Sequence, residues 1–189
     1  FPASTVPPVP PVNSAPPVTI EEQARREIDR VTRRYGARRY IAYFQAYSGT
    51  YAEVPVLRGL YDRALEASPD IVALAVGTRP DCVDPAKLDL LASYRERGYM
   101  VWVEYGLQSS CDRTLDRIGR GHDAGCFARA ARLTAEQGVG VFSHVIAGLP
   151  GEGRREFRRT AEFLAELPVD GVKLHNLNIL RGTRAARWY

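Results

Sequence analysis

Five short apolar runs, rich in β-branched and aromatic residues, alternate with helical segments along this chain. The runs are Arg39–Gln45, Ile71–Gly77, Met100–Glu104, Val139–Ala147 and Gly171–Asn178. They recur at intervals of roughly thirty residues, which is the spacing of successive β-α-β units. In such units each helix carries the chain back to the start of the sheet, so that neighbouring strands run parallel. The alternation therefore predicts an α/β fold with one parallel sheet.

Capping residues mark several of the helix boundaries. Thr19, three residues before a glutamate, begins a capping box, and Asp84 with Pro85 supplies an N-cap and a first-turn proline. The third apolar run is predicted to break at Tyr105–Gly106 and to lead through a polar loop into a helix that Asp112 caps. The segment after this strand is therefore read as loop, then helix.

Polar residues follow each predicted strand, and this distribution bears on the kind of sheet. An open doubly wound sheet gathers its ligand-binding residues in one crevice, whereas a barrel draws them from the end of every strand. Both folds fit the alternation, but polar residues at the end of every strand favour a partial (β/α) TIM-like barrel. The residues concerned are Gln45, Tyr47 and Ser48, then Thr78 and Arg79, then Glu104 and Gln108, then His144 and Gly148, and finally His175 and Asn178.

The first residues of the chain differ in composition from the rest. Phe1–Val18 holds seven of the thirteen prolines, so we expect a linker there and one domain over residues 19–189. No apolar run is long enough to cross a bilayer, and no charged segment precedes an apolar one at the start. We therefore expect a cytoplasmic protein with no membrane partner.

The cysteines and the positive charge are only weak indications of function. Cys82, Cys111 and Cys126 match neither a zinc site nor a disulfide framework, so we expect reduced thiols and no metal ligands. The net charge is +4, and four arginines at helical spacing are more often a solvated face than an RNA contact. These arginines are Arg154, Arg155, Arg158 and Arg159.

Five motifs, in order, carry a resemblance to a known family. They are AYFQAYSGTY (Ala42–Tyr51), VGTRPDC (Val76–Cys82), VEYGLQSS with LDRIGRGH (Val103–His122), HVIAGLPGE (His144–Glu152) and KLHNLNILRGT (Lys173–Thr183). Together they resemble the radical S-adenosylmethionine (SAM) enzymes over roughly Thr19 to Thr183. The chain looks most like an uncharacterised bacterial branch related to the elongator acetyltransferase subunit, and more distantly like the oxygen-independent coproporphyrinogen oxidases.

The resemblance implies a fold and a chemistry. It implies a partial barrel of six parallel strand-helix units, of which five are present here. In that family three cysteines with CxxxCxxC spacing hold a [4Fe-4S] cluster, and the cluster binds the methionine part of SAM. A reductant protein such as flavodoxin or ferredoxin supplies an electron, and SAM is cleaved to a 5′-deoxyadenosyl radical that abstracts hydrogen from the substrate.

The resemblance also implies roles for particular residues. Gln108 would hydrogen-bond the ribose hydroxyls, and Arg120 would bind the methionine carboxylate. Ile146 and Gly148 would lie against the adenine. The loop from Gln45 to Ser48, which includes Tyr47, would face the methionine amino group.

The remaining implied residues depart from the family's usual pattern or face the substrate. Gly77 stands where an acidic residue is common, so Arg79 or a backbone carbonyl would have to substitute for it in the cofactor site. Glu104 is also assigned to this site. His144 replaces an acidic ribose contact. The predicted substrate-facing residues are Lys173, His175 and Asn178.

The largest departure concerns the cluster. No three cysteines have its spacing, and the first strand and its loop are absent. We expect the barrel core of a longer enzyme, truncated at both ends and inactive alone, whose substrate is unknown. Its kinship makes tRNA or another nucleic acid a candidate substrate.

Two other classes of function stay open on the sequence. A degenerate barrel would bind SAM or RNA without catalysis. A Schiff-base lyase would use Lys173, a lysine on a late strand, as its nucleophile.

Overall fold

The computed structural model describes residues 18–183 and 185–188, so the predicted linker Phe1–Val18 lies outside the described residues except for its last member. The helices and strands alternate along this part of the chain. In order they are α1 (Ile20–Tyr35), β1 (Tyr40–Phe44), α2 (Val54–Leu65), β2 (Ile71–Thr78), the 3-10 helix η1 (Pro80–Cys82), α3 (Pro85–Glu96), β3 (Met100–Gln108), α4 (Asp112–Ile118), α5 (Ala124–Glu136), β4 (Gly140–Ala147), α6 (Arg154–Ala165), β5 (Gly171–Asn176) and the 3-10 helix η2 (Ala185–Arg187).

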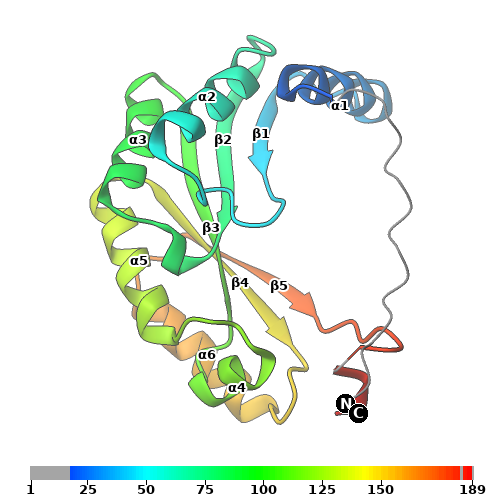
Figure 1. Cartoon of the computed structure of the whole chain (residues 1–189), viewed down its shortest axis with the longest axis vertical. Helices are drawn as coiled ribbons and strands as arrows, with labels where there is room; N and C mark the ends of the chain where they lie inside the picture. Colours follow the sequence, from blue (N-terminus) through cyan, green and yellow to red (C-terminus); the bar gives the residue numbers. More distant parts are fainter. Residues whose placement is uncertain (1–17, 184, 189) are drawn as a thin grey trace, which may run out of the picture.

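The strands form one parallel sheet in the order β1-β2-β3-β4-β5. An open doubly wound sheet reverses its strand order at a switch point, whereas a barrel keeps neighbours in sequence as neighbours in the sheet. Figure 1 shows that the sheet is curled, with α2, α3, α5 and α6 along its convex side and the concave side uncovered by helices. The sheet is therefore a half-barrel of five parallel strands, as the sequence predicted.

The core lies between the sheet and these helices. Leu74 and Val76 of β2 are fully buried, and so are Tyr94 of α3 and Phe127 of α5. Burying a side chain of this size contributes roughly 1.5–3 kcal/mol. Because the apolar contacts are concentrated on the convex side, the concave side is free to carry polar groups.

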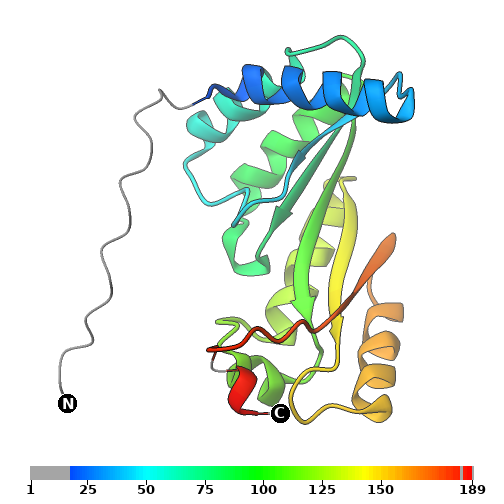
Figure 2. The ribbon, with the colours of Figure 1, turned by 90° about the vertical axis from the view of Figure 1, so that its right-hand side faces the viewer.

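Helix α1 lies apart from this core. Its N-cap forms as predicted, since Thr19 accepts a hydrogen bond from the Glu22 amide at 3.2 Å. None of its residues is fully buried, but Ile28 packs on the edge of the core. Figures 1 and 2 show α1 beside α2, at the end of the sheet where β1 begins. The helix therefore lies at the opposite end of the sheet from the strand tips.

Strand β3 is longer than predicted. The sequence placed its end at Tyr105–Gly106, but the strand continues to Gln108. Tyr105 and Leu107 are both 0% exposed, and the Tyr105 hydroxyl is 2.7 Å from Thr134 Oγ1 of α5. Burial on the convex side thus outweighs the tendency of a glycine to end a strand. The pairing with β4 shifts register between Gly106 and Gln108.

The predicted cap of α4 is also wrong. Cys111 holds the N-cap position, and Asp112 is the first residue of the helix. Asp112 Oδ1 instead accepts a hydrogen bond from the amide of Ala124, at 2.8 Å, at the start of α5. Its carboxylate therefore stabilises the neighbouring helix. The cap predicted at Asp84 does form, because Asp84 Oδ1 accepts from the Lys87 amide at 3.0 Å.

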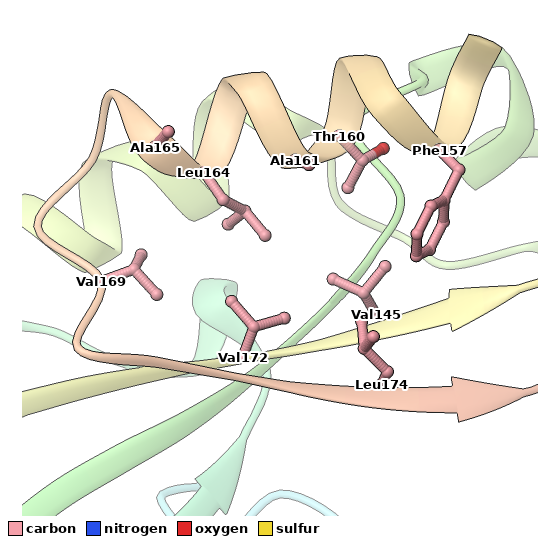
Figure 3. Close-up of a pocket in the computed structure, with 9 residues that line it drawn as sticks. All are labelled: Val145, Phe157, Thr160, Ala161, Leu164, Ala165, Val169, Val172 and Leu174. Atoms are coloured by element: carbon pink, nitrogen blue, oxygen red, sulfur yellow. The ribbon is translucent and has the colours of Figure 1, made fainter. Parts of the chain in front are cut away.

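An apolar groove of about 420 Å³ runs between α6 and the last two strands. Figure 3 shows Phe157 and Leu164 of the helix facing Val172 and Leu174 of β5 across it. Side chains alternate between the faces of a strand, so these two β5 residues point away from the concave side. Strand β5 is the edge of the described sheet, and Val172 and Leu174 are 47% and 63% exposed.

Neither a membrane span nor a metal site is found in the described part of the chain. None of the described helices combines the length and the apolar character that a bilayer crossing needs. Cys82, Cys111 and Cys126 are free thiols, and no group of three metal-ligating side chains comes together among the residues described.

Candidate functional site

The polar residues predicted from the sequence gather on the concave side of the sheet. Strand β2, which lies between β1 and β3, presents only Ala75 and Gly77 near its end on this side. Because these residues are small, the hydroxyl of Tyr43 on β1 reaches over β2 and donates to Glu104 of β3 at 2.7 Å. Side chains from strands that are not neighbours thus meet in one place.

A cavity of about 410 Å³ opens at the carboxyl ends of the first four strands. This volume lies within the range of roughly 300–1,000 Å³ for small-molecule sites. It is lined by seven of the nine predicted cofactor-binding residues together with Ser48, Gly77, Thr78 and Gly106. The seven are Gln45, Tyr47, Arg79, Glu104, Gln108, Arg120 and His144.

Arg120 brings a half-buried positive charge to the cavity wall. Its Nε and Nη2 donate to the carbonyl oxygen of Gly106, at 3.0 and 2.7 Å. No carboxylate of the described residues lies within ion-pair distance of it. Burial, followed by the nearby guanidinium of Arg79, lowers the pKa of Arg120. A buried cation without a carboxylate partner is costly, so this wall of the cavity is suited to an anionic ligand.

Gln108 lies beside Arg120 in a backbone conformation that is uncommon for a residue with a side chain. Its φ is 73°, in the left-handed region, and it ends β3 at the shift in register. Such conformations are concentrated at functional sites. The carboxamide makes no hydrogen bond with any residue that the structure describes, so both its donor and its acceptor are available to a ligand.

Gly106 keeps space open between these two side chains. A Cβ at Gly106 would come within 2.4 Å of Arg120 Nη2 and 2.7 Å of Gln108 Nε2. The two polar groups therefore cross the bare backbone of this strand. The sequence predicts this glycine only as the end of a strand, and its role in leaving space was not predicted.

The loop after β1 is anchored by hydrogen bonds to β2, α2 and η1. The Gly49 amide donates to the Gly77 carbonyl, and the Tyr61 hydroxyl donates to the Gly49 carbonyl, both at 2.8 Å. Thr50 donates to the carbonyl of Cys82 at 2.7 Å. With its far end anchored in this way, the loop holds Tyr47, which is fully exposed and has a φ of 60°, at the rim of the cavity.

Arg79 differs from Arg120 because its charge is already paired. Its Nε and Nη2 donate to the two carboxylate oxygens of Asp81, at 2.8 and 2.5 Å. The hydrogen bond from Arg79 holds the pKa of Asp81 below its usual value, although burial opposes this. Arg79 lines the cavity, but Arg120 is the stronger candidate for an anion contact.

Glu104 is the centre of a hydrogen-bonded cluster in the concave face. Trp102 Nε1 donates to its Oε1 at 3.0 Å, and His144 Nε2 lies 2.6 Å from its Oε2. Burial raises the pKa of Glu104, but hydrogen bonds from Tyr43, Trp102 and His144 outweigh it and hold the pKa below its usual value. Glu104 is therefore a carboxylate at neutral pH.

Two of the three predicted substrate residues join this cluster. Lys173 Nζ is 3.9 Å from Glu104 Oε2, and His175 Nε2 is 3.1 Å from His144 Nδ1. Asn178 lies after the end of β5, is exposed, and has no hydrogen bond to the cluster. Tyr43 and Trp102 were not predicted as members of the cluster. Trp102 lies two residues before Glu104 and so shares its face of β3, and Tyr43 lies two residues before Gln45.

Ile146 and Gly148, predicted to lie against an adenine, are not in the lining of the cavity. Ile146 pairs with His175 in the sheet and lies two residues further along β4 than His144. Gly148 follows the strand with a φ of 86°, and a Cβ there would be 3.9 Å from Leu177. Their role with an adenine stays a prediction.

Two known proteins resemble this chain in sequence. Protein YhcC of Escherichia coli (strain K12) is 50% identical over 169 residues, which is 89% of this chain and 53% of that protein. The tRNA uridine(34) acetyltransferase of Dehalococcoides mccartyi (strain CBDB1) is 29% identical over 121 residues, 62% of this chain and 26% of that protein. This chain therefore spans about half the length of the Escherichia coli relative.

A solved structure shows the same fold. The archaeal Methanocaldococcus infernus Elp3 with an N-terminal deletion superposes with a TM-score of 0.76 at 20% identity, over 89% of this chain and 44% of that one. The model of the radical SAM superfamily matches residues 7–164. With the half-barrel fold and a match over most of its length, the chain belongs to the radical SAM superfamily.

Proposed function

We propose that this chain is the SAM-binding body of a radical enzyme and that the cavity at the strand ends is its SAM site. The observation that carries the proposal is Arg120, a half-buried cation at the cavity wall with no carboxylate partner among the described residues. Its Nη1 group remains for a ligand after the two bonds to Gly106. A guanidinium in this position suits the carboxylate of an amino acid moiety.

The other cavity residues fit the rest of such a ligand. The free carboxamide of Gln108 suits neighbouring ribose hydroxyls, because it offers one donor group and one acceptor. Gly77 and Gly106 give the cavity a floor of bare backbone, on which a flat or bulky group can approach closely. When bound to a reduced [4Fe-4S] cluster, SAM supplies a 5′-deoxyadenosyl radical that abstracts hydrogen.

The ligands of the cluster are proposed to come from outside this chain. Cys82, Cys111 and Cys126 are free thiols, and the described residues hold no group of three metal-ligating side chains. The Escherichia coli relative is about twice as long as the matched segment. We infer that the present chain does not catalyse the reaction alone, and that flavodoxin or ferredoxin reduces the complete enzyme.

The substrate is proposed to occupy the concave face beside the cavity, against Lys173 and His175. Both contact the Glu104 cluster, which also lines the SAM cavity, so that cofactor and substrate would be neighbours. The name of one relative specifies tRNA uridine as what it acetylates, which makes tRNA the first substrate class to test.

Equilibrium binding of SAM tests the proposal. The complete natural protein that contains this chain is prepared with its cluster, and its affinity for SAM is measured by calorimetry. We expect Arg120→Ala and Gln108→Ala each to weaken binding by about 1–3 kcal/mol, because each removes hydrogen bonds to a charged or buried polar ligand. This corresponds to roughly 5-fold to 150-fold in the dissociation constant.

Matched controls are available on the outer surface of α5. Arg132 is exposed, and Gln137 is exposed at the end of this helix. Arg132→Ala and Gln137→Ala should bind SAM as the parent does. Parental affinity in both Arg120→Ala and Gln108→Ala would show that the SAM site is elsewhere.

A further inference from the structure

Three side chains form a diagonal row across the concave face, one from each of three neighbouring strands. Glu104 lies on β3, His144 on β4 and His175 on β5. Phe142 of β4 is opposite Glu104, and Lys173 of β5 is opposite His144, so each member lies two residues further along its strand than the one before. The row therefore rises from the interior of the sheet toward the strand ends, where substrate would enter.

The hydrogen bonds along this row fix which nitrogens carry protons. Glu104 is ionised and only accepts, so His144 must donate from Nε2 across the 2.6 Å contact. When His144 carries a single proton, this contact holds it on Nε2 and leaves a lone pair on Nδ1, which accepts from His175 Nε2 at 3.1 Å. His175 Nδ1 is left with a lone pair and no hydrogen-bond partner among the described residues. The chain of donors thus points inward from His175 to Glu104.

We propose that Glu104, His144 and His175 form a proton relay, in which His175 Nδ1 takes a proton from an O–H or N–H group of the substrate. The inference rests on the proposed function, because it requires the substrate on the concave face. The X–H bond of the substrate breaks and its electron pair stays on X, while the proton bonds to His175 Nδ1. The proton on His175 Nε2 moves to His144 Nδ1, and the positive charge comes to rest on His144 beside Glu104.

The charged groups around the row favour this direction of transfer. Burial, followed by the positive charge that His144 carries once protonated and by that of Lys173, lowers the pKa of His175, so positive charge is disfavoured on the ring at the open end and moves inward to His144. Lys173 Nζ, 3.9 Å from Glu104 Oε2, adds positive charge that stabilises an anionic X. Tyr43 and Trp102 donate to Glu104 and keep it ionised, and β2 contributes only small residues here.

The three residues therefore have different roles. His175 is the catalytic residue, because it alone would touch the reacting atoms. Glu104 and His144 are positioning residues, since the carboxylate sets the tautomer of His144, which in turn sets that of His175. A buried carboxylate acts on the imidazole of a catalytic triad in the same way.

Nitrogen-15 NMR of the histidine side chains of the complete protein tests the relay, because it distinguishes the tautomers of each ring. We expect both His144 and His175 to carry their protons on Nε2 at neutral pH. As the pH falls, the first proton taken up by the pair should switch His175 to the Nδ1–H tautomer without making it an imidazolium. The relay is wrong if His175 becomes an imidazolium while His144 stays neutral.

Glu104→Gln provides a second and independent readout. The amide group of the new side chain can donate to His144 Nε2, which moves the proton of His144 to Nδ1 and reverses the hydrogen bond to His175. We therefore expect both histidines to switch to the Nδ1–H tautomer. If His175 keeps its tautomer in this variant, the two rings are not coupled and the proposal fails.

Two further variants keep the result interpretable. If Glu104→Gln does not fold, His144→Phe retains a ring without nitrogen, and His175 should then lose its fixed tautomer. His122 contacts the carbonyl oxygens of Gly106 and Asp123 outside the row, so its signals should not move in either variant. SAM binding by Arg120→Ala is measured separately, so unaltered SAM binding would reject the proposed SAM site, whereas uncoupled tautomers would reject the relay.

Discussion

At the scale of single residues, Gly106 leaves the space that is occupied by Arg120 and Gln108, the two side chains proposed to bind SAM. The Arg120 side chain folds over this glycine and is held by its carbonyl oxygen, and the Gln108 carboxamide also lies close to the space that a Cβ would occupy. The φ angle of Gly106 is not in the left-handed region, so a residue with a side chain could adopt the same backbone conformation. Its importance is therefore the space it leaves and not the freedom of its backbone.

Gly106→Ala should weaken SAM binding with little loss of stability. The new Cβ meets the ends of two side chains, Arg120 Nη2 and Gln108 Nε2, which can move aside more easily than backbone can. We expect an affinity for SAM lower by roughly 5-fold to 150-fold, as for loss of one of these side chains, and a urea midpoint close to that of the parent. Calorimetry and urea unfolding measure the two effects. A large fall in the urea midpoint with unaltered affinity would contradict this role.

At the same scale, the sequence predicted the members of the cavity better than their contacts. Seven of the nine residues predicted to bind the cofactor line one cavity, because residues after parallel strands share an edge of the sheet. The pairing of Arg79 with Asp81 and the crossing of Gly106 by Arg120 were not predicted. Both depend on side-chain conformations, which the residue pattern does not specify.

At the scale of elements, helix α2 contains a glycine, Gly59, whose substitution should change the stability of the protein and leave ligand binding unaltered. Gly59 lies inside this helix, and a Cβ at this position would meet no atom within 4 Å. The glycine therefore lowers the propensity of the helix without making room for a neighbour. Helix α2 is on the convex side, away from the cavity.

Gly59→Ala should stabilise the protein by about 0.4–1 kcal/mol, because alanine loses less conformational entropy than glycine on entering a helix. Urea unfolding should show a higher midpoint with the same slope. Affinity for SAM should be unaltered, which makes this variant the control for Gly106→Ala. A lower urea midpoint for Gly59→Ala would mean that the position is more crowded than the structure shows.

The elements also show which local signals can be trusted. Thr19 and Asp84 cap helices as predicted, because N-capping is decided by a residue and its immediate neighbours. The end of β3 was predicted wrongly, because Tyr105 and Leu107 are held by packing against α5 and the other convex-side helices. Tertiary burial is not visible in a short window of sequence, so strand ends near the core are predicted less well than helix caps.

At the scale of the whole molecule, the curled sheet makes one site from residues on separate strands. The parallel order and the barrel class followed from the alternation of elements and from polar residues at every strand end. The row of Glu104, His144 and His175 did not follow, because it depends on the register between three strands. A shift of one residue in that register would place one side chain on the opposite face.

The most direct test of the account is whether the complete protein cleaves SAM. The natural protein containing this chain is reconstituted with iron and sulfide without oxygen and reduced, and 5′-deoxyadenosine is measured by chromatography. We predict its formation in the parent, a strong reduction in Arg120→Ala, and parental formation in Arg132→Ala. A protein that binds SAM and a cluster but forms no 5′-deoxyadenosine would contradict the assignment of radical chemistry and would indicate a binding barrel.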